Sequence, residues 1–392
     1  MAEGLLVIPP NDILRHPLPN RIYHIAKGLS KYFRIYLLSY KGHPLRSDRK
    51  LRDLDCEEIE IEHAFRTKNV GAYYLLNAPQ ILRSIAKALS ERNISVVIHA
   101  NILPSYIVSR MAKEAGIPTI YDFLDYFPES AAAYYSSRSL RFLSHSFVES
   151  IVKRSLRMST KIVTVSYTFK KLIESLINRR ENNIEIIPNG IDHRLFRPMP
   201  TDVARKKTGL SDYERIILYY GSLDVWIDFS TLLGSVKGRD DLVLVLIGAS
   251  HNSDAMKKLK YLIKKLGLEE KVIMIPPQPY ERIPLFINSA DLVLAPYKRV
   301  IKNYVTPLKI AETLACGKPV ITQNIGEFKL WFSEKNVFYY NNFAEVKGII
   351  NNILDNYEAV TQDAEVIADR VRKKFSWDNL VKKYLRVMEG LL

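Results

Sequence analysis

The fold is decided by three neighbouring segments, Asp291-Leu-Val-Leu-Ala-Pro296, Thr306-Pro-Leu-Lys-Ile-Ala-Glu312 and Gly317-Lys-Pro-Val-Ile321. The first is an apolar run that ends at a proline, which is typical of a buried strand. Thr306 suits the N-cap of a helix and Pro307 its first position, and the glycine that opens the third segment suits the end of that helix. The segments therefore predict a strand, a helix and a second strand of a parallel sheet.

The same alternation of short apolar runs and amphipathic, Lys-rich segments occurs in two series along the chain. In the first series we expect strands at 5–8, 35–39, 95–99, 119–122, 162–166 and 184–187. In the second series we expect them at 216–220, 242–247, 272–275, 292–295, 319–322 and 337–340. The stretch from Pro188 to Pro200 is rich in turn-forming residues and favours a crossover between two domains.

A length of 392 residues exceeds the size at which one hydrophobic core usually stops growing. We expect an α/β protein with an N-terminal Rossmann-like domain over 1–198 and a C-terminal one over 199–375. Residues 376–392 carry a helical apolar stripe, which we expect to pack back on the N-terminal domain.

Lys and Arg exceed Asp and Glu by 57 to 42, and the net charge of +15 suits an acidic partner such as nucleotide phosphate or an anionic membrane surface. No nucleic-acid motif accompanies the charge, so nucleic acid is not expected. Cys56 and Cys316 lie far apart, which favours a reducing compartment. The apolar runs are too short for a signal peptide or a membrane span. We therefore expect a cytoplasmic protein, soluble or peripheral on the inner face of the membrane.

The helix that begins near Pro307 has the features of a phosphate site. Its first amides, at Leu308 and Lys309, face the carboxyl end of the sheet, where open α/β folds bind ligands. Lys309 adds a positive charge, and Glu312 follows on the same helical face, where it could accept hydrogen bonds from sugar hydroxyls. The alternative is an ordinary Lys/Glu pair on a solvated helix.

These segments resemble a known family. Asn189-Gly-Ile-Asp192 with Phe196-Arg-Pro198, Ala290 to Pro296, and Pro307 to Glu312 with Ala315 to Ile321 are together similar to the retaining family 4 glycosyltransferases and their GT-B relatives. The resemblance implies two Rossmann-like domains facing across a cleft. It implies transfer of a sugar from a nucleoside-diphosphate sugar to a glycan or lipid-linked acceptor. No cofactor is expected.

The resemblance also implies roles for individual residues. The donor diphosphate would lie at Lys309, Thr306 and Ser222, the ribose at Glu312, the donor sugar at Asn303, Tyr304 and Val305, and the nucleobase at Gln278 and Pro279. The alternative for Gln278 and Pro279 is an ordinary turn. Tyr304 stands where the family has a glutamate, and the family's Arg and Lys after the glycine at 221 are missing. Lys309 is therefore expected to hold more of the diphosphate. Retention is favoured, and inversion stays open.

Asp122 and Asp125 follow a predicted strand and are the candidates for a catalytic carboxylate, with Glu129 as a third. The alternative for Asp122 is that it caps the turn after the strand. Asp53-Leu-Asp55 lies in a charged stretch, Ser47 to Glu60, without supporting ligands, so we interpret it as solvated surface and expect no metal.

The stretch from Ser136 to Lys161 combines basic and large apolar residues. It could lie on an anionic bilayer, or it could be a domain helix with a solvated basic face. Two other functions remain open on the same fold: a nucleotide-sugar epimerase or phosphorylase, and a non-catalytic nucleotide-binding relative.

Overall fold

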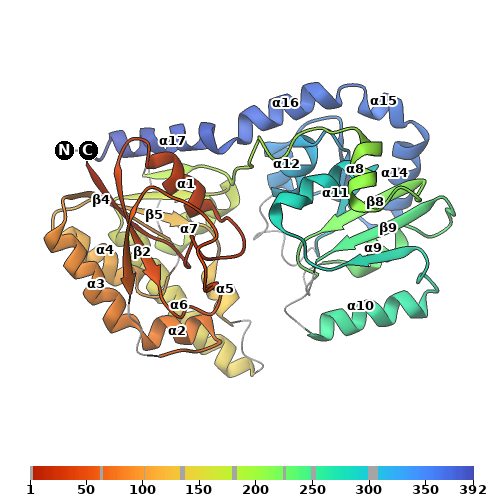
Figure 1. Cartoon of the computed structure of the whole chain (residues 1–392). Coiled ribbons are helices and arrows are strands. Elements are labelled where there is room, and N and C mark those ends of the chain that lie inside the picture. The colour runs from red at the N-terminus through yellow and green to blue at the C-terminus, as the bar shows by residue number, and fades with distance from the viewer. Residues whose placement is uncertain are drawn as a thin grey trace. The chain divides into compact units, whose positions relative to one another are not determined.

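The protein is described from a computed structural model, which covers residues 3–61, 65–100, 102–132, 137–178, 183–223, 227–248, 253–298 and 308–392. The chain forms two compact units (Figure 1). The first comprises Met1–Asn189 and Trp377–Leu392, and the second comprises Gly190–Ser376. Both are α/β units built on parallel sheets.

The first unit contains a seven-stranded sheet in the order β3-β2-β1-β4-β5-β6-β7. Its strands are β1 Gly4–Ile8, β2 Arg34–Tyr40, β3 Glu57–Ile61, β4 Ile94–Ala100, β5 Thr119–Phe123, β6 Lys161–Thr164 and β7 Ile184–Ile186. Its helices are α1 Arg21–Leu29, α2 Val70–Leu76, α3 Ala78–Glu91, α4 Ser105–Glu114, α5 Phe127–Ala132, α6 Arg138–Met158, α7 Tyr167–Ile177 and α17 Trp377–Glu389.

The second unit contains a six-stranded sheet in the order β10-β9-β8-β11-β12-β13. Its strands are β8 Arg215–Tyr220, β9 Leu242–Ile247, β10 Val272–Ile275, β11 Leu292–Ala295, β12 Val320–Gln323 and β13 Val337–Tyr340. Its helices are α8 Thr201–Thr208, α9 Phe229–Gly234, α10 Ser253–Lys265, α11 Ile283–Ser289, α12 Leu308–Ala315, α13 Gly326–Trp331, α14 Phe343–Asp355, α15 Tyr357–Thr361 and α16 Ala364–Phe375. A 3-10 turn over Tyr280–Arg282 precedes α11.

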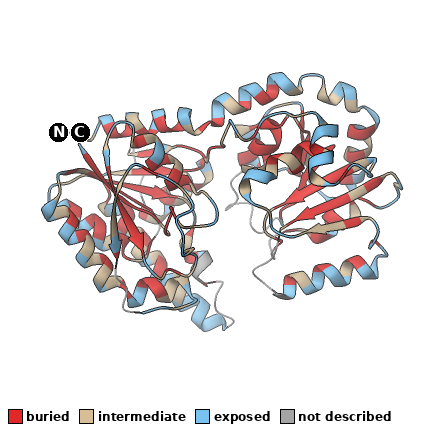
Figure 2. Ribbon diagram, in the orientation of Figure 1, coloured by how far each residue is buried: buried red, intermediate tan, exposed pale blue. Residues whose placement is uncertain are grey.

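The central strands are buried on both faces because helices cover both sides of each sheet, as a parallel sheet requires. Figure 2 shows the strands of both sheets largely buried and most helices buried along one face. In β1, Leu5 and Val7 join one apolar core, whereas Leu6 and Ile8 join the core on the opposite face of the sheet. The strand runs expected from the sequence all form strands, and β9, β10, β11 and β13 have the expected bounds.

The C-terminal helix α17 belongs to the first unit. Leu380, Tyr384 and Met388 are buried in the core that α1 and one face of the first sheet also form. Gly28 of α1 allows this contact, because a Cβ at that position would overlap the Val381 side chain.

The charged stretch Ser47 to Glu60 runs into an edge strand, β3, that was not predicted from the sequence. Residues 57–61 pair in parallel with β2, and Ile61 is buried. The charges are tolerated because arginines neutralise them: Glu58 pairs with Arg15 at 2.6 Å and Glu57 with Arg92 at 2.8 Å. Asp53 and Asp55 themselves are exposed.

Helix α6 divides into two parts. Its second half buries Val148, Val152 and Leu156 as an ordinary domain helix would. Its first half leaves Leu143 and Phe147 more than half exposed. Among the residues that the structure describes, no helix has the length and apolarity needed to cross a membrane.

Candidate functional site

The topology of the second unit marks a ligand site at one edge of its sheet. The chain passes from β8 outward to β9 and β10 and then returns to β11 on the other side of β8. The connections after β8 and β11 therefore diverge, and ligands bind at this switch point beyond the carboxyl ends of the strands. Gly221 directly follows β8, and α12 is the helix that follows β11.

Lys309, in the first turn of α12, lies against Gly221. A Cβ on Gly221 would lie 2.9 Å from Cε and 3.1 Å from Nζ of Lys309, and Gly221 has a φ of +118°. A Cβ on Gly248, which follows β9, would overlap the Gly221 carbonyl oxygen. These two glycines let two loops and a lysine converge, since only glycine adopts such backbone angles and leaves the space empty.

The ammonium group of Lys309 is bounded by aromatic rings. Its Nζ lies 5.8 Å from the centroid of Tyr219 and 5.7 Å from that of Tyr297, within the range of cation–π attraction. Burial lowers the pKa of Lys309, but Tyr297, Tyr219 and Glu312 together outweigh it and raise the pKa above its ordinary value. Lys309 therefore keeps a full positive charge at neutral pH.

Glu312 is almost completely buried, with 3% of its surface exposed. The Tyr220 phenol donates a hydrogen bond to Oε2 at 2.9 Å, and the Tyr280 phenol donates one to Oε1 at 3.1 Å. Burial raises the pKa of Glu312 to about 7, against the opposing effects of Tyr220, Lys309 and Tyr280. A buried carboxyl that titrates near neutrality next to a lysine at a switch point is typical of a functional site.

The predicted nucleobase residues adjoin this cluster through Tyr280. Gln278 is half-buried and its side-chain amide donates to the Pro276 carbonyl at 3.1 Å, while Pro279 is exposed and precedes the 3-10 turn. That turn directs Tyr280 to Glu312, and the Tyr280 ring also packs on Phe196 with centroids 5.3 Å apart. Ser222 accepts a hydrogen bond from the Tyr219 phenol at 2.5 Å through its carbonyl oxygen.

Both halves of the chain match known protein families. Residues 19–195 match Glycosyltransferase Family 4, and residues 200–373 match Glycosyl transferases group 1. The chain belongs to the glycosyltransferases, with a Family 4 first half and a group 1 second half. Sequence relatives include a D-inositol 3-phosphate glycosyltransferase from Acidothermus cellulolyticus. It is 25% identical to this chain, and the match covers 59% of this chain and 53% of the relative. The matches span less than two thirds of the length of such curated relatives.

Solved structures share the GT-B fold of the group 1 family. Sucrose-phosphate synthase from Thermosynechococcus elongatus superposes with a TM-score of 0.78 at 15% identity, covering 100% of this chain and 99% of that chain. HepE from Anabaena, solved in complex with UDP-glucose, has a TM-score of 0.70 at 16% identity and full coverage of both chains. At these identities the likeness concerns the fold.

Asp122, one of the two predicted catalytic carboxylates, is enclosed in the first unit. Nε of Arg21 donates to both carboxylate oxygens of Asp122, at 3.0 and 3.1 Å, and the Tyr384 phenol donates at 3.2 Å. None of its surface is exposed. Burial raises the pKa of Asp122, and Arg21 and Tyr384 oppose that rise. A carboxylate closed in by these donors joins β5, α1 and α17 and offers no surface to a substrate.

Asp125 and Glu129 are exposed on the segment that follows β5. Asp125 accepts a hydrogen bond from the Tyr126 amide at 2.7 Å, and Glu129 lies 3.8 Å from Nε2 of His145. Asn303, Tyr304, Val305 and Thr306 lie outside the described residues. Within the described ranges, no three His, Cys, Asp or Glu side chains converge as metal ligands would.

Sequence reasoning missed the aromatic part of the site. Tyr219 and Tyr220 belong to β8, where tyrosine is common for its strand propensity alone, so their positions gave no functional signal. Tyr280 lies two residues after Gln278, and that proximity to a predicted site residue was the only available signal for it.

Proposed function

We propose that the protein transfers a sugar from a nucleoside-diphosphate sugar to a glycan or lipid-linked acceptor, with retention at the anomeric carbon. The observation that carries this proposal is the position of the Lys309 ammonium over Gly221, with Glu312 one helical turn further on. A charged lysine at the switch point suits a diphosphate, and stabilising the departing diphosphate is the main demand of such a transfer.

Each part of the donor then has its own contact. Lys309, with the Ser222 loop and the residue at Thr306, would hold the diphosphate. Glu312 would receive the ribose, because a carboxylate oxygen that accepts one tyrosine hydroxyl keeps a lone pair for a second donor. The nucleobase would lie at the turn of Gln278 and Pro279, and the sugar at Asn303 to Val305. HepE, which shares the fold, was solved with UDP-glucose, so a uridine donor is the first to test.

We assign the catalytic role on the acceptor side to Asp125. It is exposed, whereas Asp122 is not. In a retaining transfer its part would be to accept a hydrogen bond from the attacking hydroxyl. The proposed reaction uses no metal, and Lys309 supplies a positive charge to the diphosphate.

The test is calorimetric titration of the purified chain with UDP, GDP and ADP, followed by turnover of the corresponding donor sugars. Lys309→Ala should weaken nucleotide binding at least about tenfold, since a buried charged contact to phosphate is lost. Lys257→Ala is the matched control, because Lys257 is an exposed lysine of the same unit, 79% accessible. Wild-type affinity in Lys309→Ala would overturn the assignment of the site.

Product analysis separates this proposal from its alternatives. The anomeric configuration of the product, read by NMR, tests retention. An epimerised free donor or dependence on inorganic phosphate would instead indicate an epimerase or a phosphorylase. Tight nucleotide binding without transfer to any acceptor would indicate a binding protein.

A further inference from the structure

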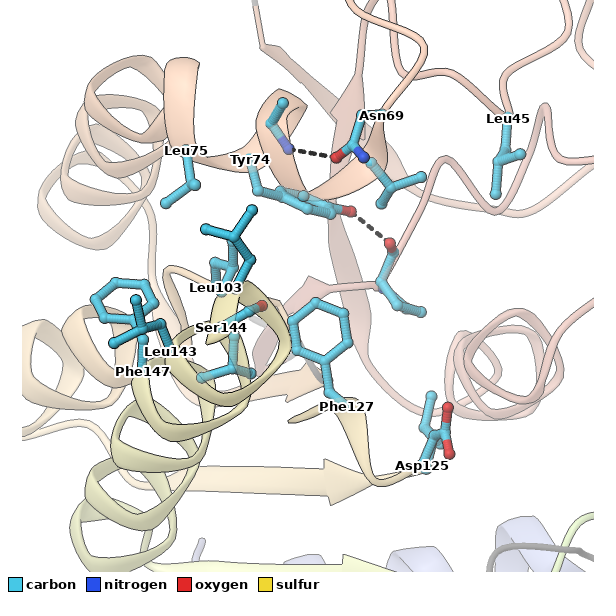
Figure 3. Close-up of a pocket in the computed structure, with 17 residues that line it drawn as sticks. Leu45, Asn69, Tyr74, Leu75, Leu103, Asp125, Phe127, Leu143, Ser144 and Phe147 are labelled. Atoms are coloured by element: carbon cyan, nitrogen blue, oxygen red, sulfur yellow. Dashed lines mark hydrogen bonds between the residues drawn. The ribbon is translucent and has the colours of Figure 1, made fainter. Parts of the chain in front are cut away.

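The first unit contains a cavity of about 770 Å³ at its own topological switch point. The cavity is bounded by Pro10 after β1, Leu103 after β4 and Leu124 after β5, with α2 and α6 as walls. Figure 3 shows side chains from these elements pointing toward one another around the space. Its volume lies within the range of small-molecule sites, roughly 300 to 1,000 Å³.

The lining suits a hydrocarbon better than a sugar. Most lining side chains are apolar, and two of the polar ones are already engaged. The Tyr74 phenol donates to the Pro10 carbonyl, and Oδ1 of Asn69 accepts from the Ala72 amide as the cap of α2. A sugar would find few partners for its hydroxyls here, and an unpaired buried hydroxyl is costly.

Large apolar side chains extend from the cavity to the surface. Leu75 of α2 and Leu143 and Phe147 of α6 line the cavity and are 55%, 61% and 54% exposed. Exposed apolar groups gathered at the rim of a pocket mark a binding site for an apolar ligand. The first turn of α6 carries Arg138 and Arg141, and the helix has no acidic residue before Glu149. This end of the helix therefore suits a ligand with a negative charge.

We propose that this cavity binds the hydrocarbon chain of an amphiphilic acceptor with an anionic headgroup. The role of the ligand as acceptor rests on the proposed function. Figure 3 shows Asp125 at one end of the lining and Leu143 and Phe147 at the other, with Phe127 between them. The chain of the lipid lies along the apolar end, and the hydroxyl to be glycosylated reaches the end at Asp125.

Binding is tested by calorimetric titration of the full chain with dodecyl phosphate below its micellar concentration, and with butyl phosphate. Dodecyl phosphate should bind at least about tenfold more tightly, because its longer chain buries more apolar surface. Ser144→Phe, which fills the cavity, and Leu143→Asn, which removes part of its wall, should each weaken dodecyl phosphate binding about tenfold. Equal affinity for the two phosphates would overturn the proposal.

Phe142→Asn is the matched control. Phe142 lies on the same helix and is 70% exposed, but it does not line the cavity. Its substitution should leave dodecyl phosphate binding unchanged. If Phe142→Asn weakened binding as much as Leu143→Asn, the ligand would be adsorbing to the surface of α6, and the cavity assignment would be wrong.

Transfer to lipid is measured with a radiolabelled donor sugar and a total lipid extract as the acceptor pool. Label should enter the organic phase with the wild type and with Phe142→Asn, and less with Leu143→Asn and Ser144→Phe. Label confined to water-soluble product would overturn the lipid acceptor. Titrations of the wild-type chain separate the two proposals: dodecyl phosphate binding without UDP binding would reject only the donor site, and UDP binding with equal affinity for dodecyl and butyl phosphate would reject only the cavity.

Discussion

The Tyr280 phenol donates a hydrogen bond to Oε1 of Glu312 at 3.1 Å, and this contact joins the turn after β10 to the helix after β11. Two connections on opposite sides of β8 thus meet at one carboxyl group. Burial raises the pKa of Glu312 to about 7, so a single hydrogen bond influences its charge in the neutral range.

In Tyr280→Phe, the midpoint of the pH dependence of nucleotide binding should lie at a higher pH than in the wild type. The hydrogen bond from Tyr280 lowers the pKa of Glu312, so its loss raises that pKa further. At pH 7 more Glu312 is then protonated and the affinity falls, whereas at pH 8.5 it recovers. Calorimetric dissociation constants from pH 6 to 9 measure this. Tyr261→Phe, at an exposed tyrosine of α10, is the control. An unchanged pH midpoint would contradict the role of Tyr280.

Glu312→Gln should alter the pH dependence of stability. The pKa of Glu312 is raised from 4.5 to about 7 in the folded protein, so the stabilising contribution of its protonated form is complete below pH 4.5 and is lost as pH rises through 7. The wild type should lose roughly 3 kcal/mol of unfolding free energy from this group across that window. Urea unfolding at pH 5 and pH 8 should show a smaller loss in Glu312→Gln. Parallel pH profiles of the unfolding free energy for the wild type and Glu312→Gln would contradict this prediction.

Gly221→Ala should impair both stability and nucleotide binding. Its φ of +118° strains any other residue, and the added Cβ would displace the Lys309 side chain. We expect a loss of about 1–3 kcal/mol of stability and at least about tenfold weaker binding.

Gly209→Ala is the control for that substitution. Gly209 has a φ of +71°, but a Cβ there would meet nothing within 4 Å. It should lose stability and keep its nucleotide affinity. Similar binding defects in both variants would show that strain alone, without Lys309, accounts for the effect.

Arg21→Met should destabilise the first unit by about 3–5 kcal/mol, because it leaves the Asp122 carboxylate buried without its cation. Urea unfolding followed by circular dichroism measures this. Asp122→Asn should also be destabilised, whereas the turnover of its folded fraction should remain close to that of the wild type. A large fall in turnover without a change in stability would restore Asp122 as a catalytic group.

The periodicity of the sequence predicted most of the fold because fully buried parallel strands read as unbroken apolar runs. It missed β3, because Glu57 to Glu60 is an edge strand whose charges are neutralised by arginines distant in sequence. The site was predicted in part for a similar reason. Lys309 and Glu312 share one helix turn, so their pairing is local, whereas Tyr220 and Tyr280 reach Glu312 from 92 and 32 residues away.

The enclosure of Asp122 depended on a contact between residues far apart in sequence. Its partner Tyr384 is 262 residues further along the chain, and no local pattern distinguishes an aspartate that ends in solvent from one covered by a terminal helix. The exposure of the first half of α6 could not be predicted from the sequence either. Leu143 and Val148 have the same apolar character in sequence and opposite exposure in the structure.

Helix α17 makes the first unit discontinuous along the chain, because residues 190–376 of the second unit precede it. The first unit lacks part of its core until Leu380, Tyr384 and Met388 have left the ribosome, and by then residues 190–376 have all been made. The second unit, although later in sequence, has its complete set of residues first. Domains synthesised first usually finish folding first. In this protein the core of the N-terminal domain is complete only once α17 has been synthesised, after every residue of the second unit.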